Sequence, residues 1–282
     1  MPIPLRDLTG ARGRPTLGVV IRFKNSASTL PGVLEALRRQ TVRPDLILGV
    51  NNQSADASPE MLKSVGARVL EWKQPYHHSR VLNLALSQCP TDLVLVLSSH
   101  TVLDSTDSLE RLAGAMADSR TACVSCKWDA DSFYTDAIDW AELTTKGLKF
   151  GSIYSNSMGM LRRSLWQQTP FDESLPTMED GAWALQQVQR GYVCRRLKLD
   201  FRYQRGTTDR TFVFAALTFK LAARHGLFVT WLGPSASLKS LVRYLAARTF
   251  RSTSQAERSE ALVHLERLRA WLIGRWQRKL AE

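Results

Sequence analysis

The sequence predicts an α/β fold: a mixed, mainly parallel sheet with helices on both faces, followed by a helical C-terminal segment. Short apolar, β-branched runs alternate with amphipathic helical patterns over the first 100 residues, which predicts the sheet. The connections between these runs are only a few residues long, which favours parallel strands joined by helices. Beyond residue 205, apolar residues recur at helical spacing with basic residues between them, which predicts the helical segment.

The first part of the sheet is expected to begin with LGVVIRF, residues 17–23. The pattern that follows is helical, and Ser28 is its expected N-cap. DLILGV, residues 45–50, predicts the second strand. The next helix is expected to have Ser58 as its cap and Pro59 at its first position, where the missing N–H of proline does no harm.

Two more strands and a helix complete this part. ARVLEW (67–72) and DLVLVL (92–97) predict strands, and SRVLNLALSQC (79–89) predicts the helix between them. Ligands bind at the carboxyl ends of parallel strands, so the polar strand ends FKN, NNQSAD and SSH are expected to gather at one site. The sequence has no GxGxxG after the first strand and no GxxxxGK[ST], so it supports neither a dinucleotide fold nor a P-loop.

The pattern changes after residue 128. Residues 129–152 are polar and aromatic with weak periodicity, and we expect a long irregular segment such as a lid. Residues 153–197 predict a strand, a short helix, an acidic turn, a second helix and a strand. The helices expected further on span residues 210–228, 237–249 and 254–280. The predicted parts are an N-terminal lead-in, one α/β domain and a basic amphipathic helical region, at residues 1–15, 16–205 and 206–282.

The charge is concentrated in the C-terminal region. The net charge is +12, and the residues after 200 include fifteen Lys and Arg against five Asp and Glu. Such a region favours an anionic surface such as phospholipid, although a solvated helix face is an equal alternative. No nucleic-acid-binding motif accompanies the charge, so nucleic acid is not an expected partner.

The compartment is predicted from three absences. The first residues lack the apolar core of a signal peptide, and no run of about 18 uncharged apolar residues predicts a membrane span. Four cysteines do not make a disulfide framework in a chain of this length, and Cys123-x-x-Cys126 without a second pair is weak evidence for zinc. We therefore expect a reducing, cytoplasmic location.

Four stretches, in order along residues 17–201, resemble the family 2 glycosyltransferases of the GT-A fold. They are VVIRFKNSASTLPGVLEALRRQ, LILGVNNQSADAS, HHSRVLNLALSQCPTDLVLVLSSH and FDESLPTMEDGAWALQQVQRGY. The IRFKN opening and the LSSH strand end most resemble the branch of rhamnosyltransferases and other cell-envelope transferases. The resemblance implies a GT-A catalytic domain that binds a nucleotide-diphosphate sugar and transfers the sugar with inversion.

By this resemblance the acidic pair Glu179 and Asp180 is catalytic. An inverting transferase needs one positioned carboxylate, and the resemblance makes Asp180 the general base for the acceptor hydroxyl. Glu179 then orients the base or contacts the sugar. The alternative is that both acids only cap the helix that begins there, where backbone N–H groups favour carboxylates.

The resemblance also assigns residues to the nucleotide sugar. They are Asn25, Asn51, Asn52, Asp56, Arg80, Asn83, Ser98, Ser99 and His100. Family members commonly have an acid where Asn51 and Asn52 stand; an amide can still hydrogen-bond a base edge, or it can form an ordinary Asx turn. Asp56 is equally suited to capping the next helix.

The triplet Ser98, Ser99 and His100 stands where the family has its Asp-x-Asp motif, with His100 at the metal-holding position. Three interpretations stay open. His100 binds Mn²⁺ or Mg²⁺, of which Mn²⁺ accepts nitrogen more readily. Alternatively, His100 donates to the diphosphate without a metal, or the site has lost its activity. Without a metal, the positive charge has to come from side chains such as Arg80, His77, His78 or Arg22.

Two aromatic residues of the irregular segment, Tyr134 and Trp140, are candidates for stacking against the acceptor sugar, or else core anchors of the segment. We expect the acceptor to be a saccharide or a lipid-linked saccharide, and the basic region to lie on the inner face of the cytoplasmic membrane. The alternative is a non-catalytic nucleotide- or saccharide-binding subunit of a glycan assembly complex. The sequence leaves the oligomeric state and the donor sugar open.

Overall fold

The computed structural model describes residues 14–127, 133–149 and 153–204, together with 217–218, 220–222, 224–227 and 229. The expected helices at 237–249 and 254–280, most of the one at 210–228 and most of the lead-in lie outside these residues. The described residues fall into two compact units. The first contains those up to Asp139 and from Ile153 onward to 204, and the second contains 140–149 and the short stretches after 216. The predicted division at residue 205 stays a prediction.

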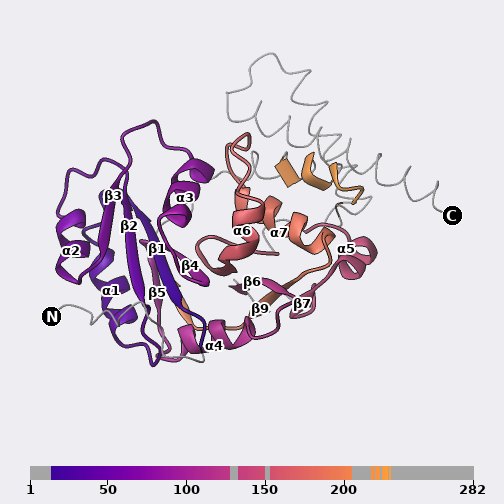
Figure 1. The fold of residues 1–282 in the computed structure, drawn as a ribbon, viewed down its shortest axis with the longest axis horizontal. Helices are drawn as coiled ribbons and strands as arrows, with labels where there is room; N and C mark the ends of the chain where they lie inside the picture. Colours follow the sequence, from indigo (N-terminus) through magenta and orange to yellow (C-terminus); the bar gives the residue numbers. More distant parts are fainter. Residues whose placement is uncertain are drawn as a thin grey trace, which may run out of the picture. The chain divides into compact units, whose positions relative to one another are not determined.

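Within the described residues, the first unit is built on an eight-stranded sheet in the order β3-β2-β1-β4-β8-β6-β9-β7 (Figure 1). Its strands are β1 (Leu17–Phe23), β2 (Leu46–Asn51), β3 (Arg68–Glu71), β4 (Leu93–Ser98), β6 (Thr121–Cys126), β7 (Ala137–Ile138), β8 (Met158–Arg162) and β9 (Val193–Leu197). The strands β1 to β4 are parallel, β8 runs antiparallel to β4 and β6, and β9 is parallel to β6. The predicted mixed, mainly parallel sheet is confirmed.

Helices cover both faces of this sheet. The helices of the described residues are α1 (Leu30–Arg38), α2 (Ser58–Ser64), α3 (His78–Ser87), α4 (Ser108–Ala115), α5 (Trp140–Lys146), α6 (Arg163–Gln168) and α7 (Glu179–Gln189). Apolar residues of α1, α2 and α4 share one core cluster with alternate residues of β1 and β4. On the other face, α3 packs against β1 and β2, α6 against β8, and α7 against β6 and β9.

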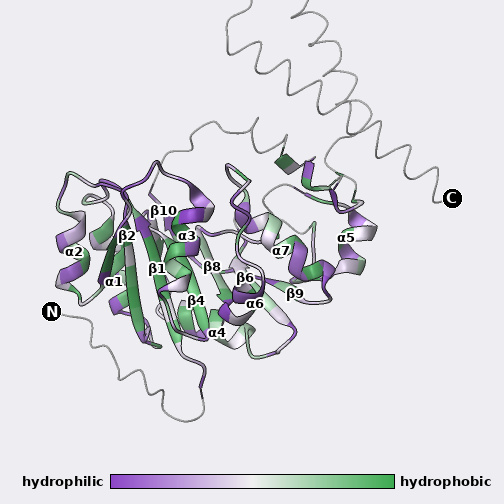
Figure 2. Ribbon diagram, turned by 45° about the horizontal axis from the view of Figure 1, so that its top comes forward, coloured by the Kyte–Doolittle hydropathy of each residue, from purple (hydrophilic) through white to green (hydrophobic). Residues whose placement is uncertain are grey.

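The central strands are apolar because both of their faces are covered. Every residue of β4 is buried, and Figure 2 shows β1 and β4 as hydrophobic strands in the middle of the sheet. Burial of both faces is what an unbroken apolar run, rather than an alternating one, predicts. Among the described residues we find no helix with the length and apolar character that crossing a bilayer requires.

A small second sheet, which the sequence pattern did not predict, fixes the end of β4. The strands β5 (Thr101–Leu103) and β10 (Phe201–Tyr203) pair antiparallel, and Thr101 lies opposite Tyr203. The carbonyl of His100 accepts a hydrogen bond from the N–H of Gln204 at 2.8 Å. The triplet at the end of β4 is therefore held between the large sheet and the small one.

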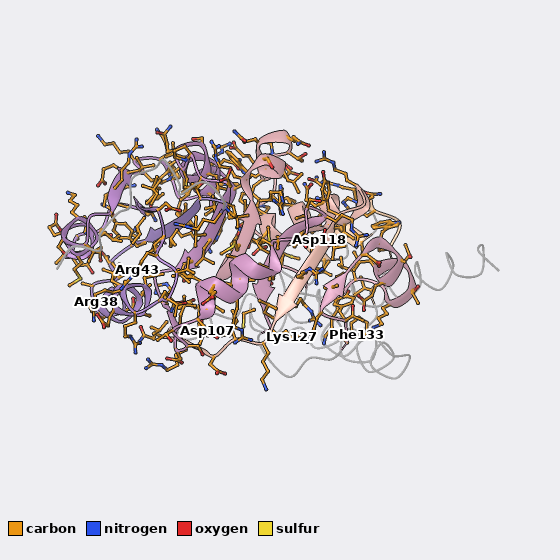
Figure 3. All side chains as sticks on the ribbon, turned by 60° about the horizontal axis from the view of Figure 1, so that its bottom comes forward. Arg38, Arg43, Asp107, Asp118, Lys127 and Phe133 are labelled. Carbon is orange, nitrogen blue, oxygen red and sulfur yellow. The ribbon has the colours of Figure 1, made fainter. Side chains whose placement is uncertain are left out.

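Helix α4 was also not predicted. Figure 3 shows it between the labelled side chains of Asp107, its N-cap, and Asp118. Leu109 and Leu112 of α4 are fully buried in the core cluster that α1 and α2 share. Helix α4 thus extends the helical layer on this face of the sheet.

Three details of the predicted elements were wrong. The N-cap of α1 is Thr29 rather than Ser28, because the carbonyl of Ser26 accepts the N–H groups of both Thr29 and Leu30. The N-cap of α2 is Ala57, and Ser58 is already helical. The expected irregular segment contains β7, which pairs with β9, and α5, which belongs to the second unit. A two-residue strand depends on a distant neighbour, so local periodicity does not show it.

Candidate active site

The two predicted catalytic acids open helix α7. The residue before them, Met178, is the N-cap and has a left-handed backbone with φ of 64°. Glu179 and Asp180 therefore occupy the first turn, where the free N–H groups of the helix favour negative charge. Glu179 is buried, at 3% exposure, and Asp180 is partly buried.

Asp180 is held by two backbone donors. Its Oδ2 accepts the N–H of Asn156 at 2.9 Å, and its Oδ1 accepts the N–H of Gly181 at 2.7 Å. Burial, and then the charge of Glu179, raise the pKa of Asp180 to about 6, while the two N–H donors and Arg22 oppose the rise. A carboxylate with such a pKa is still mostly ionised at neutral pH and is a stronger base than an ordinary one.

Asn156 joins the two acids, and the sequence analysis did not identify it. Its Nδ2 donates to Glu179 Oε1 at 3.2 Å, while its backbone N–H binds Asp180. The Asn156 side chain is buried, and its Oδ1 has no hydrogen-bond partner among the described residues. The only signal in the sequence was an Asn in the polar run before β8, and such a run is common in loops.

The acids lie next to the end of β4. The N–H of Ser98 donates to the carbonyl of Ser157 at 2.9 Å, and the neighbouring Asn156 binds Asp180. Two hydrogen bonds and one peptide link thus connect the end of β4 to the candidate base. The structure therefore brings Ser98 and Asp180, which are far apart in the sequence, to the same edge of the sheet.

The other two residues of the triplet differ in their surroundings. Ser99 is buried, and its Oγ lies 2.9 Å from Ser26 Oγ, while its carbonyl accepts Thr29 Oγ1 at 2.7 Å. Ser99 therefore joins β4 to the loop before α1. The ring of His100 is partly exposed, lies edge-on to Tyr203 and has Nδ1 3.4 Å from Ser99 Oγ.

The residues at the end of β4 do not fit a divalent metal ion. Two hydroxyls and one imidazole lack the carboxylates that Mg²⁺ and Mn²⁺ prefer. Across the described part of the chain, no three His, Cys, Asp or Glu side chains converge as a possible metal site. We therefore derive no catalytic step through a metal held by His100.

The predicted nucleotide residues on the loop after β2 do come together, but most of their polar atoms already have protein partners. Asn51 is buried, and it donates to Glu71 Oε2 at 2.9 Å and accepts the N–H of Ser54 at 2.9 Å. It forms the Asx turn that was the alternative interpretation. Asn52, which is 9% exposed, makes no side-chain hydrogen bond within the described residues and remains a candidate.

Asp56 and Asn25 connect the loops after β1 and β2. Asp56 accepts the N–H of Ala27 and both the N–H and the hydroxyl of Ser58. The hydroxyl of Ser58, followed by the backbone donors, lowers the pKa of Asp56. Asn25 Oδ1 accepts the N–H of Ala55 at 2.8 Å. Capping and loop connection, rather than contact with a ribose, account for these bonds.

The predicted roles of Arg80 and Asn83 near the phosphates are not what the geometry indicates. Arg80 is exposed and forms an ion pair with Glu173 at 3.4 Å. Asn83 donates to the Phe171 carbonyl and to Glu173, and accepts from Trp166 Nε1 and the Phe171 N–H. Its whole amide is bonded to α6 and to the turn before α7, so we do not include either residue in the proposed site.

The two acceptor candidates also change. Tyr134 is 1% exposed, and Arg196 lies 5.6 Å from the centre of its ring and donates to its carbonyl at 2.6 Å. A ring this buried cannot stack on a sugar, so Tyr134 is a core anchor, as the alternative interpretation had it. Trp140 is the first residue of α5 in the second unit, and its role stays a prediction.

Comparisons with known proteins agree with this architecture. The family model described as glycosyl transferase family 2 matches residues 18–175, and Glu179 and Asp180 lie just beyond the match. The O-antigen chain rhamnosyltransferase RfbN of Salmonella typhimurium is 25% identical over 194 residues, which are 62% of this chain and 61% of that protein. The chain thus spans less than two thirds of the length of this relative.

Solved structures of low sequence identity show the same fold. The mannosyltransferase of Pyrobaculum calidifontis, solved with GDP-Man and Mn²⁺, has a TM-score of 0.61 at 15% identity and covers 93% of this chain and 88% of its own. S. aureus TarS in complex with UDP-GlcNAc has a TM-score of 0.58 at 12% identity, over 89% and 79% of the two chains. These likenesses confirm the predicted GT-A fold. Because the family model covers more than half of the sequence, the chain belongs to glycosyl transferase family 2, as its ordered motifs predicted.

Proposed function

We propose that this protein is an inverting glycosyltransferase of cell-envelope or capsular polysaccharide synthesis. It moves a sugar from a nucleotide-diphosphate sugar to a hydroxyl of a saccharide or lipid-linked saccharide. The observation that carries the proposal is Asp180: a carboxylate fixed by two N–H donors beside the end of β4, with a pKa of about 6.

The reaction needs one displacement. The acceptor oxygen attacks the anomeric carbon, the bond from that carbon to the diphosphate breaks, and the diphosphate leaves with the electron pair. Asp180 takes the proton of the acceptor hydroxyl. Glu179 is buried and bonded to Asn156, which also bonds the base; after burial, the charge of Glu179 is the second cause that raises the pKa of Asp180. A single base suffices because no covalent sugar–enzyme intermediate forms in an inverting reaction.

The names of similar proteins support the substrate class. The curated relative is a rhamnosyltransferase of O-antigen chains, and solved structures with this fold contain GDP-Man or UDP-GlcNAc. These names favour a nucleotide-sugar donor and a polysaccharide product for this chain as well.

The test is a variant of the base. Wild type and Asp180→Asn are incubated with a panel of nucleotide sugars, and sugar transfer and slow donor hydrolysis are measured. We expect the variant to lose about 10²- to 10⁴-fold in rate, which is the usual contribution of a general base. Asp107→Asn is the matched control, because Asp107 lies at the start of α4 and its side chain makes no cap hydrogen bond. A variant as active as wild type contradicts the role of Asp180.

One observation favours a second candidate function. The triplet at the end of β4 lacks the carboxylates of the family motif, as a non-catalytic nucleotide- or saccharide-binding subunit would. The same panel separates the two functions. The binding subunit is supported if wild type binds a nucleotide sugar but neither transfers nor hydrolyses it, and if Asp180→Asn behaves in the same way as wild type.

The basic region extends the proposal to location. With fifteen Lys and Arg against five Asp and Glu after residue 200, we propose that it attracts the chain to anionic lipid at the inner face of the membrane, where lipid-linked acceptors are available. Removing the residues after about 235 is expected to move the protein from the membrane to the soluble fraction. Unchanged partitioning contradicts this role.

A further inference from the structure

The transfer leaves a diphosphate whose negative charge needs a partner, and the end of β4 offers no metal site that fits. The sequence names four cationic side chains near the strand ends: Arg80, His77, His78 and Arg22. In the structure these four side chains have different surroundings. Arg80 is exposed and paired with Glu173, and His78 lies against Tyr76. His77 has a buried Nδ1 without a partner among the described residues, but a single ring nitrogen offers only one hydrogen bond.

Arg22 occupies a central position. It is the second-last residue of β1, and in the sheet it lies opposite Ser98 of β4 on one side and Val50 of β2 on the other. Its neighbours Ile21 and Phe23 face the core shared with α1. Because side chains alternate along a strand, Arg22 points to the other face, on which α3 and α7 pack.

Arg22 is partly buried, and its guanidinium is charged and incompletely bonded. Burial acts to lower the pKa of Arg22, but the charges of Tyr76, Glu179, Asp180 and Tyr203 together raise it. Its Nη1 is buried without a hydrogen-bond partner among the described residues. A buried donor on a charged group is costly to leave unpaired, so this nitrogen is suited to an anionic ligand.

Two other buried atoms beside the acids lack partners in the described structure. Asn156 Oδ1 and Tyr154 Oη are both unbonded, and the side chains that carry them are 1% and 3% exposed. The charges of Asp180 and Arg22 both act on the Tyr154 hydroxyl. Unpaired polar atoms are rare in protein interiors, and three of them around one carboxylate pair indicate that a polar ligand completes the site.

We propose that Arg22 binds the diphosphate of the donor and neutralises it as it leaves, in the place that a carboxylate-held divalent ion would take. This inference rests on the proposed transfer. As the bond from the anomeric carbon to the diphosphate breaks, the oxygen that gains the electron pair lies against the guanidinium, while the acceptor proton passes to Asp180. A guanidinium presents a planar fork of donors that fits two phosphate oxygens, and it keeps its charge at any pH the enzyme meets.

The experiment measures binding of UDP, GDP, dTDP and CDP to the full chain by calorimetry in EDTA, together with the corresponding nucleosides. Wild type is expected to bind one diphosphate without metal. Arg22→Met is expected to weaken that binding roughly ten- to hundredfold, and Arg22→Lys by less, while nucleoside binding is unchanged. Arg68→Met is the matched control, since Arg68 is exposed at the start of the edge strand β3, where its side chain donates to Gln88.

Each outcome decides something. Two results overturn the role of Arg22 and leave the proposed transfer intact. One is that Arg22→Met binds the diphosphate as tightly as wild type does. The other is that wild type binds the diphosphate only when Mn²⁺ is added. Wild type that binds none of the four diphosphates overturns both proposals. Asp180→Asn that keeps diphosphate binding but loses transfer separates the base from the cation. If Arg22→Met fails to fold, by its thermal unfolding curve, Arg22→Lys and Arg22→Gln carry the same comparison.

Discussion

Two groups of polar side chains in and around the candidate site differ in how completely the protein itself satisfies them. In the first group, Asn51 at the end of β2 and Asn83 in helix α3 use both ends of their amides on neighbouring protein groups. In the second group, beside α7, Arg22, Tyr154 and Asn156 each keep a buried atom without a partner in the described residues.

The difference separates structural from functional polar residues. A satisfied amide contributes to folding and has little left to offer a ligand, whereas an unsatisfied buried atom lowers stability until something binds it. The sequence does not separate the two groups, because it does not show which polar side chains find partners in the folded chain. Changing one member of each group therefore tests whether the hydrogen bonds that a polar side chain makes within the protein predict a structural or a ligand-binding role.

The largest effect is expected from the charge of Asp180. Because its pKa is raised to about 6 and a general base must be ionised, activity is expected to rise with pH through 6. Below that value kcat/KM is expected to fall about tenfold per pH unit, so about hundredfold by pH 4. The pH profile of kcat/KM measures this, with intrinsic fluorescence at each pH to show that the protein stays folded. A midpoint near 4 contradicts the perturbed site.

The next effect concerns stability rather than rate. Asn83→Ala removes four hydrogen bonds, one to Trp166 of α6 and three to the turn before α7, and we expect it to lower the free energy of unfolding by about 2–3 kcal/mol. Urea unfolding of the variant measures this loss. Affinity for the nucleoside diphosphate is expected to change less than about twofold. A normal unfolding curve with a tenfold loss of affinity restores Asn83 to the binding site.

The matched pair Asn51 and Asn52 gives the sharpest form of the comparison, because the two residues are adjacent and only one is satisfied. Asn51→Ala is expected to lower the free energy of unfolding by about 1–2 kcal/mol. Asn52→Ala is expected to leave stability within about 0.5 kcal/mol but to weaken nucleoside diphosphate binding roughly threefold to tenfold. Unfolding and calorimetry on both variants measure the pair. If Asn51→Ala instead weakens binding and Asn52→Ala lowers stability, then the hydrogen bonds that a polar side chain makes within the protein do not predict its role.

Local sequence predicted much of the fold because the central strands carry their own signal. Apart from Arg22 and Ser98, the runs LGVVIRF and LVLVLS are apolar, since helices cover both faces, and β1 and β4 begin and end within a residue of the prediction. The acids of α7 were predictable as well, because an acidic pair at a helix start is a local pattern. The strands β5, β7 and β10 have two or three residues each, and they depend on partners far along the chain.

The site was only partly predictable for the same reason. Asn156 meets Asp180 because β8 inserts antiparallel between β4 and β6, and no spacing in the sequence announces that insertion. Arg80 and Asn83 of α3 both contact Glu173, but no spacing in the sequence shows that a turn 88 residues later occupies Asn83. Motif position finds polar residues near a site. Three-dimensional pairing decides which of them are free to bind.

The smallest effect is expected at Tyr154, where the hydroxyl oxygen alone tests the comparison between satisfied and unsatisfied polar groups. The ring lies 6.2 Å from the ring of Trp183, and a Cβ at Gly159 would come within 2.5 Å of it, so the ring is tightly held. Tyr154→Phe removes only the unpaired hydroxyl, and we expect stability to stay equal or to rise by up to about 1 kcal/mol.

Burial keeps the pKa of the Tyr154 phenol well above its usual value, so in wild type it can only be a neutral donor or acceptor. If that hydroxyl meets the bound sugar, KM for the donor rises a few-fold in the variant while kcat holds. Thermal unfolding and steady-state kinetics measure both quantities, and a loss of about 2 kcal/mol with unchanged KM would assign Tyr154 to the satisfied, structural group.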